Sequence, residues 1–259
     1  MRVLFISDIV ASPGRDGLAA AMPGLRQRHS PDLIIANGEN SAGGIGITAK
    51  TANELFEIGV DVITTGNHVY RHREAYEFLD RSDRVVRPAN YPVGNPGRGV
   101  TVVEAAGKRV GVLNLSGAVQ LRVARSPFAE ADAQLAALAD KADAVIVDFH
   151  AEVTSEKVAM GWHLDGRVAA CLGTHTHVPT ADARILPGGT AFITDVGMTG
   201  SRAGVIGVRR EQALEAFRTQ MPVKFDTADE DLWVNAVAVK VRDDGLSESI
   251  EQVLVPAPR

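Results

Sequence analysis

The fold is decided by a stretch in the second half of the chain, Val168-Ala169-Ala170-Cys171-Leu172-Gly173-Thr174-His175-Thr176-His177. A run of small and apolar residues that ends at Gly-Thr is typical of a buried strand leaving a sheet at its carboxyl end. Open α/β sheets hold their ligands at that edge. If the chain stays extended, His175 and His177 point to the same side, because side chains alternate with a period of two. The stretch therefore predicts an α/β fold with two imidazoles side by side at a strand exit.

The composition is that of an ordinary globular protein. The 259 residues are 45% hydrophobic and 23% charged, which is enough apolar material for a sizeable core. The single cysteine, Cys171, excludes a disulfide framework and a multi-cysteine zinc module, and we expect a buried, inert thiol. The chain runs from Met1 straight into an apolar segment without a signal-peptide pattern, and no apolar run reaches the length of a membrane span. We therefore expect a cytoplasmic protein with no membrane partner.

The net charge bears on the partners of the protein. A formal net charge of −5 argues against a basic surface that coats nucleic acid, so we expect no tight nucleic-acid binding. Any anionic ligand must then be attracted by a local positive charge. The sequence leaves the oligomeric state open, and a homo-oligomer is compatible with it.

Polar side chains follow one predicted strand after another. The apolar runs 2–6, 33–36, 60–65 and 144–149 have the composition of buried strands. Because the carboxyl ends of parallel strands meet at one edge of a sheet, we expect the residues that follow these strands to lie together. Those residues are Asp8, Glu39, Asn40, Asn67, His68 and His150.

The remaining segments complete the expected architecture. Turn residues predict antiparallel hairpins over 100–113, 181–196 and 233–255. Helices are expected after a turn at 11–14, with Pro23 kinking or ending the first one, and over 71–79, 126–138 and 211–220. A helix that ends at Gly59 has either Thr48 or Thr51 as its cap, and another begins near Thr154. Without repeats or linkers, we expect one domain over 1–259, a four-layer α/β/β/α sandwich of two mixed sheets flanked by helices.

The residues at the strand exits form a set that suits metal ions. They supply oxygen and nitrogen donors without a thiolate, and a carboxylate can bridge two cations through its two oxygens. Each residue alone has an ordinary explanation, such as a turn acid, a loop amide or a hydrogen-bonded histidine. Their repeated position at strand exits favours one explanation, a site for two metal ions with Glu39 as the bridge. The candidate ligands are Asp8, Glu39, Asn40, Asn67, His150, His175 and His177.

Five longer motifs are spread over nearly the whole chain: Ser7-Asp8-Ile9-Val10, Ala36-Asn37-Gly38-Glu39-Asn40, Thr64-Thr65-Gly66-Asn67-His68, His150-Ala151-Glu152 with Thr154-Ser155-Glu156-Lys157, and Thr194-Asp195-Val196-Gly197-Met198-Thr199-Gly200. They resemble the YmdB-like bacterial phosphodiesterases, a branch of the calcineurin-like metallophosphoesterases. Two departures from the general superfamily, Val10 in place of a histidine and Glu39 in place of the bridging aspartate, are features of this branch, and Asn40 would fill the lost position.

The resemblance implies a role for each candidate residue. It implies iron at both positions, although oxygen and imidazole ligands also accept manganese. His68 is left free beside the metals, where an imidazole can donate a proton at neutral pH. The alternatives for His68 are a third ligand or a loop residue that only forms hydrogen bonds. The implied ligands are Asp8, Glu39, Asn40 and His177 for the first metal, and Glu39, Asn67, His150 and His175 for the second.

The resemblance also implies a substrate and a mechanism. The substrate is a small phosphodiester, a 2′,3′-cyclic nucleotide, which is hydrolysed to a 3′-nucleotide. A hydroxide held between the metals would attack phosphorus while His68 protonates the departing oxygen. Two alternatives stay open: a phosphomonoesterase or protein phosphatase on the same metals, and a metal-stabilised regulatory or RNA-binding protein with little turnover. The lack of a basic stripe counts against tight RNA binding.

Two further features have a functional and a structural interpretation. Arg71, His72 and Arg73 follow the third strand exit and either clamp a phosphate or begin a solvated helix. Gly43, Gly44 and Gly46 either cradle a phosphate or form a flexible loop beside Glu39, and we favour the loop.

Overall fold

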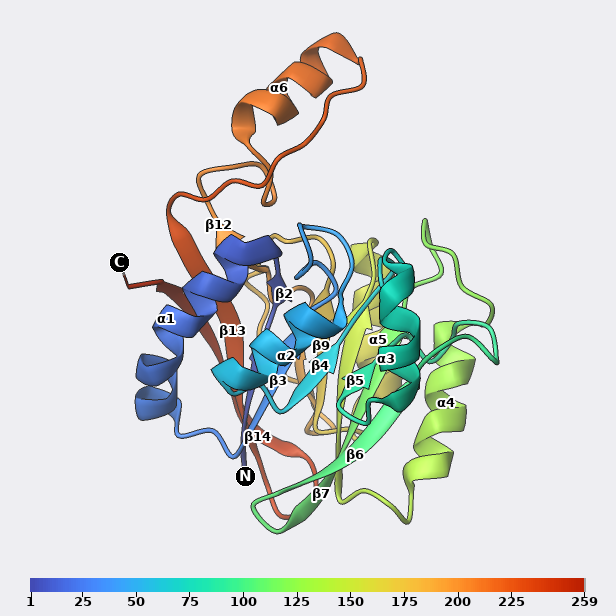
Figure 1. Ribbon diagram of the computed structural model, residues 1–259. Helices are drawn as coiled ribbons and strands as arrows, with labels where there is room; N and C mark the ends of the chain where they lie inside the picture. Colours follow the sequence, from blue (N-terminus) through green and yellow to red (C-terminus); the bar gives the residue numbers. More distant parts are fainter. Residues whose placement is uncertain (259) are drawn as a thin grey trace.

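The computed structural model describes residues 1–258 and consists of two β-sheets that pack face to face between helices (Figure 1). The first sheet has the order β2-β12-β13-β1-β3-β4-β5, and β14 also pairs with β13. In it, β1, β3, β4 and β5 run parallel to one another, whereas β13 is antiparallel to β1, β12 and β14. Its strands are β1 (Arg2–Ile6), β2 (Asp8–Ile9), β3 (Leu33–Asn37), β4 (Val62–Thr64), β5 (Val85–Val86), β12 (Met198–Ser201), β13 (Leu232–Val241) and β14 (Ser247–Pro256).

The second sheet has the order β10-β11-β9-β8-β7-β6. The four central strands are parallel, and the edge strands β6 and β10 are antiparallel to their neighbours. Both sheets are therefore mixed, as expected. The strands are β6 (Val100–Ala105), β7 (Lys108–Ser116), β8 (Ala144–His150), β9 (Ala170–Thr174), β10 (Arg184–Ile185) and β11 (Ala191–Ile193).

Successive side chains of each strand point to opposite faces of the sheet, and this divides the core into layers. Leu4 and Ile6 of β1 pack with the helices on the outer face of the first sheet, whereas Val3 and Phe5 pack between the two sheets. Phe149 of β8 packs on the outer face of the second sheet. The α/β/β/α sandwich is thus confirmed, with α1 (Ala11–His29), α2 (Ala49–Ile58) and α3 (Tyr76–Arg81) on one side and α4 (Pro127–Leu138) and α5 (Thr154–Leu164) on the other.

The last helix, α6 (Arg210–Thr219), lies on an arm that projects away from the two sheets (Figure 1). Ala213 is its only buried residue, and Leu214 and Phe217 are exposed. Among the described residues, none of the helices combines the length and the apolar composition needed to cross a membrane.

The beginning of α1 differs from the expectation. Residues 11–14 form the first turn of the helix rather than a separate turn, and Pro13 fits there because the first N–H groups of a helix have no intrahelical partner. Pro23 does not end the helix, which continues to His29. Leu18, Met22 and Leu25 are buried against the first sheet on both sides of the proline, and their packing holds the segment helical.

The other helix predictions are confirmed with small shifts. Thr48 rather than Thr51 is the N-cap of α2, and reciprocal hydrogen bonds between the two threonines form a capping box. Gly59 ends the helix. The segment expected as a helix over 71–79 forms only a 3-10 turn, Arg73–Ala75, followed by α3. His72 precedes it in an extended conformation, and its Nε2 atom lies 2.9 Å from the Ile45 carbonyl oxygen.

Candidate metal centre

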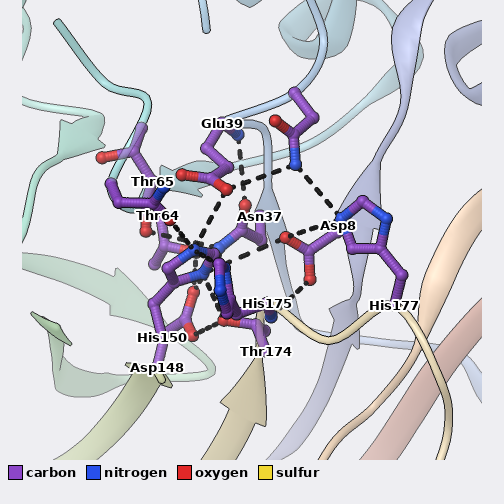
Figure 2. Close-up of polar contacts among 12 residues, drawn as sticks. Asp8, Asn37, Glu39, Thr64, Thr65, Asp148, His150, Thr174, His175 and His177 are labelled. Carbon is purple, nitrogen blue, oxygen red and sulfur yellow. Dashed lines mark hydrogen bonds and ion pairs between the residues drawn. The ribbon is translucent and has the colours of Figure 1, made fainter. Parts of the chain in front are cut away.

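The carboxyl ends of strands from both sheets meet at one edge, where the predicted polar side chains converge (Figure 2). The register brings Ser116, His150 and Thr174 level at the ends of β7, β8 and β9. Asp8, Glu39 and His150 are at most 1% exposed. Asp8 lies two residues past the end of β1, as expected, and it also begins the short strand β2, because residues 8–9 pair with β12.

His150 is the centre of a first group of donors. Its Nε2 atom lies 2.9 Å from Asn67 Oδ1, 3.0 Å from Glu39 Oε1 and 3.0 Å from His175 Nδ1. The ligand atoms of Glu39, His150 and His175 all lie within 4.8 Å of one another. These four residues are the set expected around the second metal. They form a cage of nitrogen and oxygen donors without sulfur, which suits a divalent transition metal.

A second group surrounds Asp8. Asn40 Nδ2 lies 3.2 Å from Glu39 Oε1 and 3.2 Å from His177 Nε2, and His177 Nε2 lies 3.8 Å from Asp8 Oδ1. Rotation of the Asn40 amide presents its oxygen instead of its nitrogen to the same space. Glu39 therefore contacts members of both groups, as a bridging carboxylate must.

Asp8 Oδ1 provides a test of whether a cation fits. The atom is buried and has no hydrogen-bond partner, whereas Oδ2 accepts the backbone N–H of His175 at 3.1 Å. A buried carboxylate oxygen without a partner is costly, and a bound cation would remove that cost. The residues of the centre thus fit metal ions.

The histidine loop differs from the sequence-based expectation. Strand β9 ends at Thr174, and His175 and His177 have φ angles of +100° and +66°. The two imidazoles therefore do not point the same way: His175 faces His150, and His177 faces Asp8 and Asn40 (Figure 2). The chain leaves the strand because His175 N bonds to Asp8 rather than to a neighbouring strand. One loop consequently supplies a histidine to each group.

Sequence reasoning missed the residues that support His150. Thr174 Oγ1 lies 2.9 Å from His150 Nδ1 and donates to Asp148 Oδ1 at 2.7 Å. Asp148 also accepts hydrogen bonds from Asn37 and Thr64. The available signal was an acid two residues before His150 in an otherwise apolar strand, because this spacing places both side chains on the same face.

His175 has a carboxylate partner of its own. Its Nε2 atom lies 2.9 Å from Glu152 Oε2, which leaves Nδ1 facing His150. Metal-binding histidines are commonly oriented in this way by a carboxylate on the second ring nitrogen.

The electrostatics of the centre follow from burial and close charges. Burial raises the pKa of Asp8 despite the nearby histidines, and it raises the pKa of Asp148 to about 6. Burial opposes ionisation of Glu39, but the contact with His150 outweighs it and lowers the pKa of Glu39. Burial and repulsion from His150 lower the pKa of His175 to about 3. Burial opposes protonation of His150, but the nearby carboxylates of Glu39, Asp8 and Asp148 outweigh it and raise the pKa of His150 to about 9. The carboxylates thus favour a positive charge at this position, which a bound cation would supply.

His68 lies beside the donor groups. Its backbone N–H donates to Glu39 Oε2 at 3.1 Å, and its Nε2 atom lies 3.2 Å from Asn67 Nδ2. The side chain is half-buried and thus partly accessible to solvent. Gly66, just before this pair, has no room for a side chain, because a Cβ atom there would lie 2.3 Å from both Glu39 Oε2 and His150 Nε2.

The glycine loop and the segment around His72 pack against each other. A Cβ atom on Gly46 would lie 2.7 Å from Arg71 Cβ and 2.7 Å from His72 Cδ2. This contact supports a structural role for Gly46 and His72. The other two histidines lie beside acids elsewhere, His29 at Glu251 and His163 at Asp132.

Comparison with known proteins places this arrangement in a family. The family model described as "YmdB-like protein" matches residues 4–253. The chain belongs to the YmdB-like family. Within this family, a 2′,3′-cyclic-nucleotide 2′-phosphodiesterase from Bacillus subtilis (strain 168) is 46% identical over 98% of this chain and 97% of its own length.

Two crystal structures share the YmdB-like fold over nearly the whole chain. A hypothetical protein from Thermus thermophilus is 42% identical, with a TM-score of 0.93 and full coverage of both chains. A novel phosphatase from Mycoplasma pneumoniae is 32% identical, with a TM-score of 0.92 over 99% of this chain and 93% of its own. The family assignment expected from the sequence motifs is confirmed.

Proposed function

We propose that this chain is a two-metal phosphodiesterase that hydrolyses 2′,3′-cyclic nucleotides to 3′-nucleotides. The observation that carries the proposal is the pair of donor groups joined by Glu39, with the unpartnered oxygen of Asp8 between buried neighbours. The choice of substrate rests on the Bacillus subtilis relative, whose name states that activity.

The proposed ligands divide between two positions. Asp8, Glu39, Asn40 and His177 hold one metal, and Glu39, Asn67, His150 and His175 hold the other. Iron is our first choice because the family resemblance implies it, and the carboxylate, amide and imidazole donors accept manganese equally well. Such cations, when bound, acidify a coordinated water and offset the charge of the phosphoryl oxygens. They also attract an anionic substrate to a protein whose net charge is −5.

His68 is the proposed proton donor. Asn67 links the proposed proton donor to the proposed metal site. Its Oδ1 atom contacts His150, and its Nδ2 atom contacts His68 Nε2. The backbone of His68 is fixed by Glu39, and its half-buried ring lies beside Asn67 while it stays partly accessible to solvent. In the proposed reaction, His68 protonates the departing O2′ atom of the ribose.

A comparison of model substrates tests the class of reaction. We expect the manganese-loaded protein to hydrolyse bis-p-nitrophenyl phosphate faster than p-nitrophenyl phosphate. A preference for the monoester would favour the phosphomonoesterase alternative. No turnover of either compound or of a 2′,3′-cyclic nucleotide would favour the regulatory alternative. Either result would contradict the proposal.

A histidine variant with a matched control tests the proton donor. His68→Ala should lower kcat about 10²- to 10⁴-fold, the usual contribution of general acid catalysis, while the protein still binds metal. His163→Ala removes a histidine that bonds to Asp132 on the surface, and it should leave kcat unchanged. Equal kcat values for the two variants would eliminate the role of His68.

A further inference from the structure

A buried lysine lies against the loop that carries both metal-facing histidines. Lys157 of α5 is 1% exposed. Its Nζ atom donates to the carbonyl oxygen of Thr174 at 2.7 Å and to Asp195 Oδ2 at 2.5 Å. The lysine therefore fixes the residue that precedes His175.

Asp195 holds the residue on the other side of His175. Its Oδ2 atom accepts the backbone N–H of Thr176 at 3.1 Å and the Thr176 hydroxyl at 2.8 Å. Its Oδ1 atom accepts the N–H of Gly197 at 2.8 Å, which ties the carboxylate to its own segment. The Lys157–Asp195 pair thus fixes the loop both before and after His175.

The conformation that this pair holds is an unfavourable one for histidine. A positive φ angle is uncommon for residues other than glycine, and both His175 and His177 have one. A buried ion pair is in general a poor means of stabilising a core, because desolvation of the two charges offsets much of their attraction. Its contacts here are with the loop in which the His175 imidazole faces His150 and the His177 imidazole faces Asp8.

We infer that Lys157, acting with Asp195, is a positioning residue for the metal centre, because the pair holds the 175–177 loop in which His175 and His177 have positive φ angles. The inference rests on the proposed metal centre. The Lys157 ammonium donates to Thr174 and Asp195 rather than to a predicted ligand, so its hydrogen bonds act on the ligands through Thr174, Thr176 and the backbone between them. A role limited to core stability would lower the melting temperature without changing metal affinity in the folded protein.

The test compares Lys157→Met with a matched control in the same helix. Met160→Ala also alters a fully buried residue of α5, but Met160 packs in the outer core of the second sheet. Binding of Mn²⁺ is measured by titration against a chelating dye, well below the melting temperature of each variant. Lys157→Met should weaken Mn²⁺ binding about 10- to 100-fold, the usual effect of losing support around a ligand, and Met160→Ala should not change it.

A milder pair of variants keeps the test valid if Lys157→Met does not fold. Thr176→Val removes the hydroxyl that donates to Asp195 from a half-buried position, and Thr176→Ser keeps it. We expect weaker Mn²⁺ binding only in Thr176→Val. Unchanged affinity in a folded Lys157→Met, or equal affinities for the two Thr176 variants, would overturn the inference. Absence of Mn²⁺ binding by the unaltered protein would instead contradict the proposed function.

Discussion

His150 Nδ1 lies 2.9 Å from the hydroxyl oxygen of Thr174, and that hydroxyl donates its proton to Asp148 at 2.7 Å. Since the hydroxyl proton is directed at Asp148, the oxygen accepts the N–H of His150 from Nδ1. The other ring nitrogen, Nε2, then faces Glu39, Asn67 and His175. This contact fixes the ring orientation that a metal ligand needs.

Substitution of Thr174 tests that relationship. Thr174→Val should lower metal affinity about 10- to 100-fold, because it removes the hydroxyl between His150 and Asp148. Thr174→Ser keeps the hydroxyl and should bind metal nearly as the unaltered protein does. Calorimetric titration with Mn²⁺ measures both variants. Equal affinities would show that the hydroxyl does not orient His150.

A glycine pair tests how closely the donor groups are packed. Gly66→Ala should abolish metal binding, because its Cβ atom would lie 2.3 Å from Glu39 Oε2 and from His150 Nε2. Gly24→Ala is the control: Gly24 lies in α1 with nothing within 4 Å of its Cβ position, and it should leave metal binding intact. The control should also gain about 0.5–1 kcal/mol of stability from helix propensity. Metal content after dialysis distinguishes the two, and full loading of Gly66→Ala would contradict the described geometry.

The unpartnered oxygen of Asp8 predicts opposite effects on stability and metal binding. Asp8→Asn replaces the buried carboxyl group, whose Oδ1 atom has no hydrogen-bond partner, with an amide that carries no charge at any pH, so in the presence of a chelator the variant should be more stable than the parent. Added Mn²⁺ should raise the melting temperature of the parent, because a ligand of the native state stabilises it, and not that of the variant. Thermal unfolding with and without metal measures both effects. If Asp8→Asn is less stable than the parent in the presence of the chelator, the Asp8 carboxylate does not destabilise the metal-free protein.

Cys171 gives a prediction that depends on pH. Burial raises the pKa of its thiol from 9.0 to about 12, so the native thiol stays neutral at pH values where an unfolded one ionises. The folded state therefore loses stability through this residue as the pH rises from about 9 toward 12. At pH 8, a disulfide reagent should label Cys171 only after denaturant is added. Rapid labelling of the native protein would show that the thiol is accessible.

The strand exits were predictable from the sequence, and the loop geometry was not. Apolar runs before Asp8, Glu39, Asn67 and His150 identify strands whose carboxyl ends share an edge, and the structure brings those residues together. The His-x-His spacing predicted an extended chain through His175 and His177, and this prediction was wrong. A residue pattern does not show where pairing with a neighbouring strand stops.

The supporting residues depend on contacts that are distant in sequence. Asp148 interacts with Asn37, 111 positions away, and Lys157 with Asp195, 38 positions away. Neither pair shows a periodicity, and a single acid or lysine has many ordinary explanations. The fold class and the candidate ligands could thus be read from local patterns, whereas the network that orients them required the tertiary structure.

The central claim, hydrolysis of 2′,3′-cyclic nucleotides by a metal centre, is tested most directly by incubating the metal-loaded protein with 2′,3′-cyclic AMP and separating the products. We predict 3′-AMP as the main product, and its formation should stop when the metals are removed and resume when they are restored. Formation of 2′-AMP, or an unchanged substrate with fully loaded protein, would contradict the account.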